Sequence, residues 1–131
     1  MIDYTFDHIH LFTRDPEGMA KYFESMFGAE VIRSDQGGQP RIDLKLGGAD
    51  IFILDVSSNP NAGEGAAHPH CGLDHFGLSV KEIDKVCDAL KTKGANFTRG
   101  PETIRPGIRI AFIEGPDGVS IELLERGPHI S

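Results

Sequence analysis

The sequence predicts an α+β domain made of two repeated β-α-β-β-β modules, and two observations carry that prediction. An apolar-Asp-His-apolar start followed by alternating apolar residues occurs at residues 6–13 and again 67 positions later at residues 73–80. Such period-2 alternation is typical of a half-buried strand. A glycine then ends the helical stretch of each half, at Gly28 and at Gly94, and a new strand follows.

Each predicted first strand leads into an amphipathic helix, at residues 15–27 and at residues 82–93. Apolar side chains recur there at spacings of three and four, which gives each helix one buried face. The residues of these two faces are Met19, Tyr22, Phe23 and Met26 in the first helix, and Ile83, Val86, Cys87 and Leu90 in the second.

The last strands of the two halves also correspond, at residues 51–55 and 121–125, and each follows a strand and a tight turn. Module one therefore covers about residues 3–57 and module two about residues 72–127. The connector between them, about residues 57–71, is rich in Ser, Asn, Pro, Gly and Ala and suits a mobile link or a lid. Half a chain of about 60 residues buries little core alone, so we expect one domain over residues 1–131.

Composition narrows the class of protein. The chain has 131 residues, 39% of them hydrophobic and 25% charged, and no window has the apolar length of a membrane span. A net charge of −7 argues against nucleic-acid binding and favours a small-molecule substrate. The two cysteines form no CxxC motif, and the first residues lack the pattern of a secretory signal. We therefore expect a cytoplasmic protein without a membrane partner.

Four residues on the predicted strands are candidates for chemistry. Alternation places His8 and His10 on one strand face, and the repeat places His75 at the position equivalent to His8. Glu122 lies on the opposite face of the last strand from its apolar neighbours, where a carboxylate needs a partner. Two imidazoles and one carboxylate suit a divalent metal and leave open positions for water or two substrate oxygens. The alternative is that all of them are ordinary half-buried polar residues.

Three segments resemble one known superfamily: Asp-His-Ile-His-Leu, Leu-Asp-His-Phe-Gly-Leu-Ser-Val and the stretch from Ile110 to Glu125. They are similar to the glyoxalase/bleomycin-resistance/dioxygenase, or vicinal oxygen chelate, superfamily, above all to lactoylglutathione lyase (glyoxalase I). The resemblance implies that the two modules form a curved, cup-shaped mixed sheet. It also implies one divalent metal ion (Ni, Zn, Mn or Fe) on His8, His75 and Glu122. Because the cup of relatives often forms between two chains, it further implies a homodimer.

Some positions depart from that family pattern. Glyoxalase I carries a fourth ligand, a glutamate that is also its base, where this chain has Phe52, and only a register slip would bring Asp55 there. Its glutathione-holding positions are Phe12 and Val56 here, which argues against glutathione as substrate.

Two other enzyme classes of the superfamily stay open. Fe(II) ring-cleaving dioxygenases use the same three-ligand set, although Phe112 stands where they carry a tyrosine. Fosfomycin-type thiol transferases also have three ligands, but they place a threonine at the position of His10.

We therefore expect a metal-dependent lyase or isomerase that chelates vicinal oxygens of a small carbonyl substrate and stabilises an enediolate. His10 is the candidate base, with a hydrogen-bonded wall residue as the alternative role. The rival from another class is a metal-free drug-binding protein. Two weaker candidates for the base, both expected to face solvent, are Glu114 and Glu125. Three arginines are expected to be surface residues, although they could also hold an anion of the substrate: Arg41, Arg105 and Arg109. Three further histidines are expected to lie outside the site: His68, His70 and His129.

Overall fold

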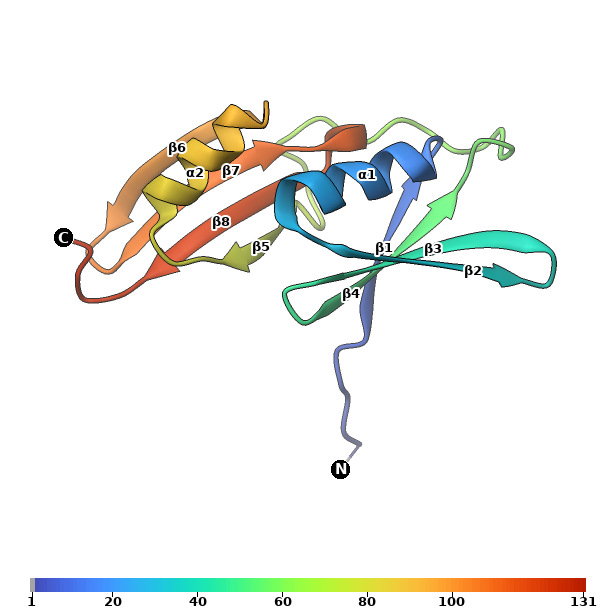
Figure 1. Cartoon of the computed structure of the whole chain (residues 1–131), viewed down its shortest axis with the longest axis horizontal. Coiled ribbons are helices and arrows are strands. Elements are labelled where there is room, and N and C mark those ends of the chain that lie inside the picture. The colour runs from blue at the N-terminus through green and yellow to red at the C-terminus, as the bar shows by residue number, and fades with distance from the viewer. Residues whose placement is uncertain (1) are drawn as a thin grey trace. The chain divides into compact units, whose positions relative to one another are not determined.

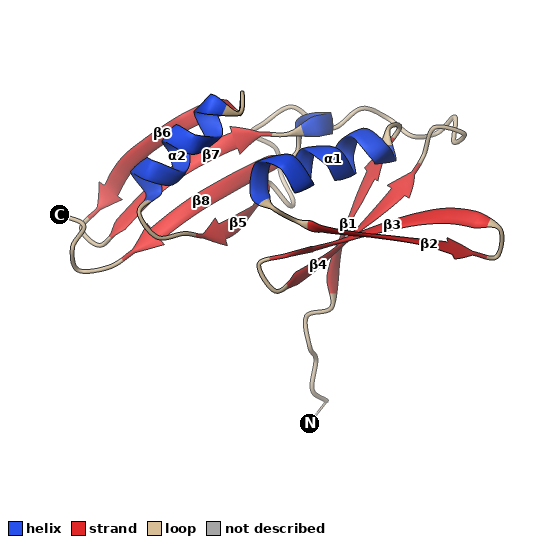
Figure 2. Cartoon of the chain, in the orientation of Figure 1, coloured by secondary structure: helices blue, strands red, loops and turns tan. Residues whose placement is uncertain are grey.

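A computed structural model describes residues 2–131 and has the predicted α+β class (Figure 1). The chain divides into two compact units, Met1–Gly63 and Glu64–Ser131, which are described separately here as module one and module two. Each unit contains one α-helix and one four-stranded mixed sheet (Figure 2). Among residues 2–131, none of the helices is both long enough and apolar enough to cross a membrane.

Module one has the predicted β-α-β-β-β order. Its sheet runs β1-β4-β3-β2, with β1 parallel to β4 and the other neighbours antiparallel. The elements are β1 (His8–Thr13), α1 (Pro16–Phe27), β2 (Glu30–Gln36), β3 (Gln39–Leu46) and β4 (Ala49–Asp55).

Module two repeats this order, and its sheet runs β5-β8-β7-β6 with β5 parallel to β8. The elements are β5 (His75–Ser79), α2 (Ile83–Thr92), β6 (Asn96–Arg105), β7 (Ile108–Glu114), a short 3₁₀ turn η1 (Pro116–Gly118) and β8 (Ser120–Arg126). The first strands begin at His8 and His75, two residues later than predicted. Phe6 and Leu73 before them are each 75% exposed, so neither contributes to a core.

Local signals explain where α1 begins and ends. The Asp15 side chain accepts a hydrogen bond from the Gly18 amide at 3.0 Å, which satisfies one of the free N–H groups of the first turn. Gly28 ends the helix in the left-handed conformation, at φ 68°, which a residue without a β-carbon adopts at low cost. The predicted glycine stop is therefore confirmed.

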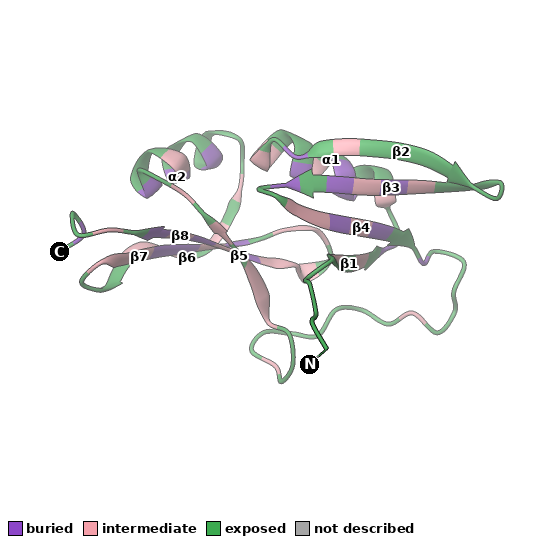
Figure 3. Cartoon of the chain, turned by 90° about the horizontal axis from the view of Figure 1, so that it is seen from below, coloured by how far each residue is buried: buried purple, intermediate pink, exposed green. Residues whose placement is uncertain are grey.

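Each helix covers one face of its own sheet. Strand residues alternate, so Ile51 and Ile53 of β4 face α1 while their neighbours face away, and the same holds for Ile121 and Leu123 of β8 under α2. In Figure 3 the buried residues accordingly lie along β4 and β8, and the edge strand β2 is largely exposed. The helix residues that are buried are Met19, Ala20 and Phe23 in α1, and Ile83, Cys87 and Leu90 in α2.

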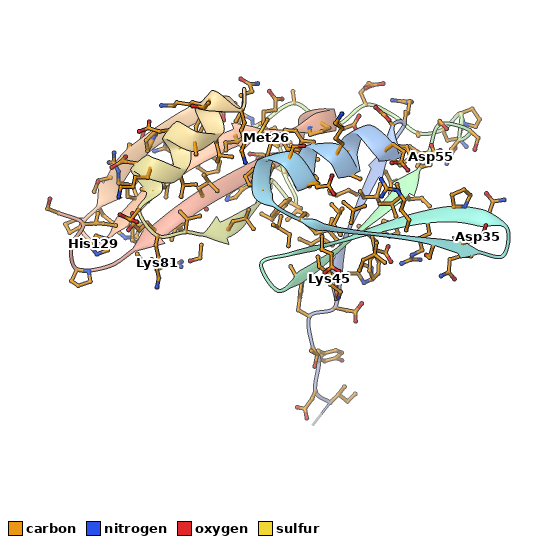
Figure 4. All side chains as sticks on the ribbon, in the orientation of Figure 1. Met26, Asp35, Lys45, Asp55, Lys81 and His129 are labelled. Carbon is orange, nitrogen blue, oxygen red and sulfur yellow. The ribbon has the colours of Figure 1, made fainter. Side chains whose placement is uncertain are left out.

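Glu125 contradicts one expectation. We expected it to face solvent, yet it is 8% exposed and lies at the start of α2. Its carboxylate accepts hydrogen bonds from the backbone amides of Glu82 at 3.1 Å and Ile83 at 3.0 Å, and His129 Nε2 lies 2.8 Å from it. Figure 4 shows His129 at the same end of module two as Lys81, just before α2. Glu125 lies on the face of β8 opposite to Glu122, and α2 covers that face, so Glu125 is buried.

This carboxylate acts as the N-terminal cap that α2 lacks in its own sequence. Glu82 occupies the cap position with a left-handed backbone and makes no side-chain cap bond. The hydrogen bonds from the Ile83 amide and from His129 lower the pKa of Glu125, because they favour its charged form. Negative charge at a helix N-terminus is also stabilised by the helix dipole.

We predict that Glu125→Gln lowers the thermal unfolding midpoint by a few degrees at pH 7, because the charged cap is lost. A carboxyl whose pKa is lowered on folding stabilises above its ordinary pKa of 4.5 and loses that effect as pH falls through its folded pKa. The difference between variant and wild type should therefore shrink in melts recorded at pH 4 and below.

The matched control for this prediction is Asp88→Asn, which removes an exposed carboxylate of the same helix. Its melting curves should follow the wild type at both pH values. Equal midpoints for wild type and Glu125→Gln at pH 7 would show that the cap does not stabilise α2.

Candidate metal centre

In module one, two histidines and a phenylalanine share the sheet face opposite α1. The β1–β4 register places His8 beside Asp50 and His10 beside Phe52. The Phe52 ring stacks on His8 with centroids 4.2 Å apart and stands edge-on to His10 at 6.0 Å. His8 and His10 thus lie on one face, as the alternation predicts, with ring centroids 6.0 Å apart.

In module two, the two predicted ligands face one another. His75 Nε2 lies 3.4 Å from Glu122 Oε1, and the Glu122 side chain is 17% exposed. The β5–β8 register sets Gly77 beside Glu122, and a β-carbon at Gly77 would lie 3.6 Å from the same oxygen. The Glu122 side chain therefore extends across the glycine toward His75. Phe112, the β7 neighbour of Glu122, stands edge-on to His75 at 4.9 Å and gives the pair an apolar wall.

Both predicted histidine ligands are held by the aspartate that precedes them. Asp7 Oδ2 lies 2.7 Å from His8 Nδ1, and Asp74 Oδ2 lies 2.9 Å from His75 Nδ1. An ionised carboxylate only accepts hydrogen bonds, so Nδ1 is the protonated nitrogen and Nε2 is left for a ligand. Metal-binding histidines are commonly oriented in this way. The Asp-His pair that recurs in both halves of the sequence is the signal from which this role of Asp7 and Asp74 could have been predicted.

The repeat makes Phe52 the counterpart of Glu122. Glu122 faces His75 in module two, whereas the Phe52 ring stacks on His8 in module one. The β4 register keeps Phe52 at this position, and Asp55 accepts a hydrogen bond from the Ser57 amide at 2.8 Å instead. The position of the fourth glyoxalase I ligand is therefore an aromatic ring here.

The donor set of module two fits a divalent ion. Two ligand atoms bound tetrahedrally at about 2.0–2.1 Å stand about 3.3 Å apart, close to the separation of His75 Nε2 and Glu122 Oε1. The structure brings these two predicted ligands together within module two. His8, the third predicted ligand, belongs to module one.

His10 opens onto a cavity of about 630 Å³ in module one. Arg41 lines the same cavity; its Nε lies 3.0 Å from Asp43 Oδ1, and its guanidinium lies 4.6 Å from the centre of the Phe52 ring. Partial burial lowers the pKa of His10, and the charges of His8 and Arg41 lower it further while Asp43 opposes them. Further lining comes from Pro16, Glu17, Arg33, Ser34 and Leu54.

The remaining candidates have other partners. Arg109 pairs with Asp84 at 2.8 Å, and exposed Glu114 accepts a hydrogen bond from Asn96 at 3.3 Å. Arg105 is exposed, as expected. Of the two positions that correspond to glutathione-holding residues, Phe12 is 58% exposed and Val56 is buried at 8%.

His68, which the sequence predicts to lie outside the site, contacts the predicted ligand His75 through Asp74. His68 Nδ1 lies 2.9 Å from Asp74 Oδ1, while the other oxygen of Asp74 meets His75. The hydrogen bond from His75, followed by that from His68, lowers the pKa of Asp74. The Gly118 carbonyl and then Asp74 raise the pKa of His68. The spacing of His68 and Asp74 along the chain gave no reason to join them, because a connector has no fixed period.

Most of the chain is similar in sequence to known proteins. A probable chloroplastic lactoylglutathione lyase of Arabidopsis thaliana is 47% identical over 126 residues, which cover 92% of this chain and 35% of that protein. The lactoylglutathione lyase of Haemophilus influenzae is 25% identical over 121 residues, which cover 90% of each chain. This chain spans less than half the length of the curated plant relatives that it matches.

The fold has solved counterparts as well. A glyoxalase family protein from Bacillus cereus superposes with a TM-score of 0.74 at 18% identity, over 92% of this chain and 93% of that one. Residues 5–123 match the family described as the Glyoxalase/Bleomycin resistance protein/Dioxygenase superfamily. With its paired modules and this match over most of its length, the chain belongs to that superfamily.

Proposed function

We propose that the protein is a metal-dependent lyase or isomerase of the glyoxalase I type that holds one divalent ion on His8, His75 and Glu122. The observation that supports this most directly is the facing pair His75 Nε2 and Glu122 Oε1 at 3.4 Å. The aspartate on the Nδ1 of each histidine adds support, because it leaves both Nε2 atoms for an ion. Relatives named lactoylglutathione lyase favour an enzyme. The donor set suits Ni, Zn, Mn or Fe.

When bound, a divalent ion would supply a Lewis acid for two vicinal oxygens of a carbonyl substrate and stabilise an enediolate. His10 is the proposed base that removes the proton from the adjacent carbon, since it lies on the same strand face as His8 and lines the cavity. Phe52 and Phe112 pack against the two histidines and would give the bound substrate an apolar wall beside each of them.

The cavity favours a small carbonyl substrate with an anionic group. Arg41 can hold a carboxylate or phosphate there through paired hydrogen bonds, in exchange for its contact with Asp43. Glutathione is disfavoured, because Val56 is buried and neither it nor Phe12 can bind the charged ends of a peptide.

We further propose that both modules build one domain with a shared cup, and that the protein is a homodimer. In this arrangement His8 comes from one protomer, and His75 and Glu122 come from its partner. A single-chain cup is the alternative, and complementation between inactive variants distinguishes the two.

The first prediction concerns metal content. His75→Ala and Glu122→Gln should each bind one equivalent of divalent metal less than the wild type, because each loses a ligand. Metal analysis of protein reloaded after chelator treatment measures this, with Glu30→Gln, an exposed strand glutamate, as the unchanged control. If the wild type holds no ion at this site, so that His75→Ala loses none, the rival metal-free binding protein is favoured.

The second prediction concerns the base. His10→Ala should lower kcat by about 100-fold or more while metal content stays at the wild-type level, because the residue is proposed to move a proton and not to bind the ion. Turnover is measured on a panel of hemithioacetals and acyl-CoA epimers with the Ni, Zn, Mn and Fe forms. Unchanged kcat in the variant would assign His10 to the wall of the cavity.

The third prediction concerns subunit sharing. If the cup forms between chains, a mixed population of His8→Ala and His75→Ala protomers contains heterodimers with one intact site. Random exchange of equal amounts should then restore about a quarter of wild-type activity, whereas each variant alone stays inactive. Activity that stays absent after verified subunit exchange would place the cup within a single chain.

The three-ligand set also favours a second candidate, an Fe(II) ring-cleaving dioxygenase. Phe52 in place of a fourth ligand is the observation that favours it, because it leaves two histidines and one carboxylate. Steady oxygen uptake with a catechol by the Fe(II) form would establish this activity in place of the lyase.

A further inference from the structure

A second group of metal-binding side chains lies in module two, where the connector meets β5. His68, His70 and Asp74 each present a ligand atom, and these three atoms lie within 4.8 Å of one another. In the sequence, the His68-Pro69-His70 segment has no third ligand at a defined spacing. The fold supplies that ligand, because Asp74 lies directly before β5 and its carboxylate reaches His68.

Both imidazoles are oriented by backbone carbonyls. His68 Nε2 lies 2.9 Å from the Gly118 oxygen, and His70 Nδ1 lies 2.9 Å from the Cys71 oxygen. A carbonyl only accepts hydrogen bonds, so these nitrogens carry a proton, and the other nitrogen of each ring is the one available to an ion. This arrangement is typical of histidines that bind metals. Because Asp74 accepts a hydrogen bond from His68 Nδ1, an ion bound there would take the place of that proton.

The spacing of these side chains also suits an ion. His68 Nδ1 and Asp74 Oδ1 are 2.9 Å apart, while two ligand atoms bound tetrahedrally at about 2.0–2.1 Å stand about 3.3 Å apart, so these two atoms need to separate by about 0.4 Å to hold an ion between them. The three ligand atoms lie within 4.8 Å of one another, so an ion would draw the His70 imidazole closer to the other two groups. The side chains of His68 and Asp74 are 31% and 41% exposed, which lets an ion enter from solvent.

Neighbouring charge favours a cation. His68 lines a cavity of about 610 Å³ in module two whose wall also carries the carboxylates of Glu64, Glu114 and Asp117. A concave surface lined by one sign of charge raises the local concentration of ions of the opposite sign.

We infer that His68, His70 and Asp74 form a second divalent-metal site, separate from His8, His75 and Glu122, for a zinc-like ion. Two imidazoles and a carboxylate suit Zn²⁺, Ni²⁺ or Co²⁺ better than Mg²⁺ or Ca²⁺. Asp74 connects the two sites, because its Oδ1 serves the new site while its Oδ2 holds the Nδ1 of His75. An ion at the second site therefore fixes the carboxylate that orients a ligand of the first.

The test is a titration of the whole chain, freed of metal by a chelator, with Zn²⁺ alone. Calorimetry and metal analysis after dialysis count the bound ions. The inference expects His70→Ala to lose one equivalent or to bind it at least about 10-fold more weakly, because one of three ligands is gone. His129→Ala is the control, since it removes an exposed imidazole outside the cluster and should leave the titration unchanged.

The same titration in a His75→Ala background separates this inference from the proposed function. The remaining zinc should still bind there, and adding His70→Ala should remove it. Zinc stoichiometry and affinity that are unchanged by His70→Ala in both backgrounds would overturn the second site. Thermal melts of each variant verify that it is folded. If His70→Ala loses zinc while His75→Ala loses none, the result supports the second site and contradicts the proposed site on His8, His75 and Glu122.

Discussion

The parallel pairing between the first and last strands of each module is the constraint on which the candidate site depends. It sets Phe52 beside His10 in module one and Glu122 beside Gly77 in module two. Phe52 and Glu122 each lie two residues after the residue that pairs with the predicted ligand histidine of their module. Because strand side chains alternate, this register turns all of them away from the helix. A slip by one residue would move Glu122 into the core under α2, where an unpaired carboxylate is costly.

The two modules keep this frame but differ in the residues placed on it. Where module two has Gly77 and Glu122, module one has His10 and Phe52. Glycine gives the glutamate room to reach His75, whereas His10 fills that space in module one and lines a cavity with Arg41. Module two thus carries the predicted carboxylate ligand, and module one carries the candidate base and an aromatic ring.

Periodicity was sufficient to predict the order of elements and the faces of the strands, because both depend on local pattern and on the repeat. It was insufficient for Glu125. The alternation correctly placed Glu125 opposite Glu122, but that face is covered by α2, and its hydrogen bonds reach residues 42 and 43 positions away. The partnership of His68 with Asp74 was missed for a similar reason, since the path of a connector has no period from which contacts can be inferred.

The two glutamates of β8 show why one carboxylate is a candidate ligand and the other has a structural role. Glu125 is saturated, with two backbone amides at 3.0 and 3.1 Å and His129 at 2.8 Å. Glu122 meets His75 at 3.4 Å, longer than the 2.7–2.9 Å of a strong charge-assisted hydrogen bond. A half-buried carboxylate held at that distance from an imidazole nitrogen is poorly satisfied by the imidazole alone. An ion bonded to both atoms would satisfy the carboxylate, and this makes Glu122 the stronger candidate for chemistry.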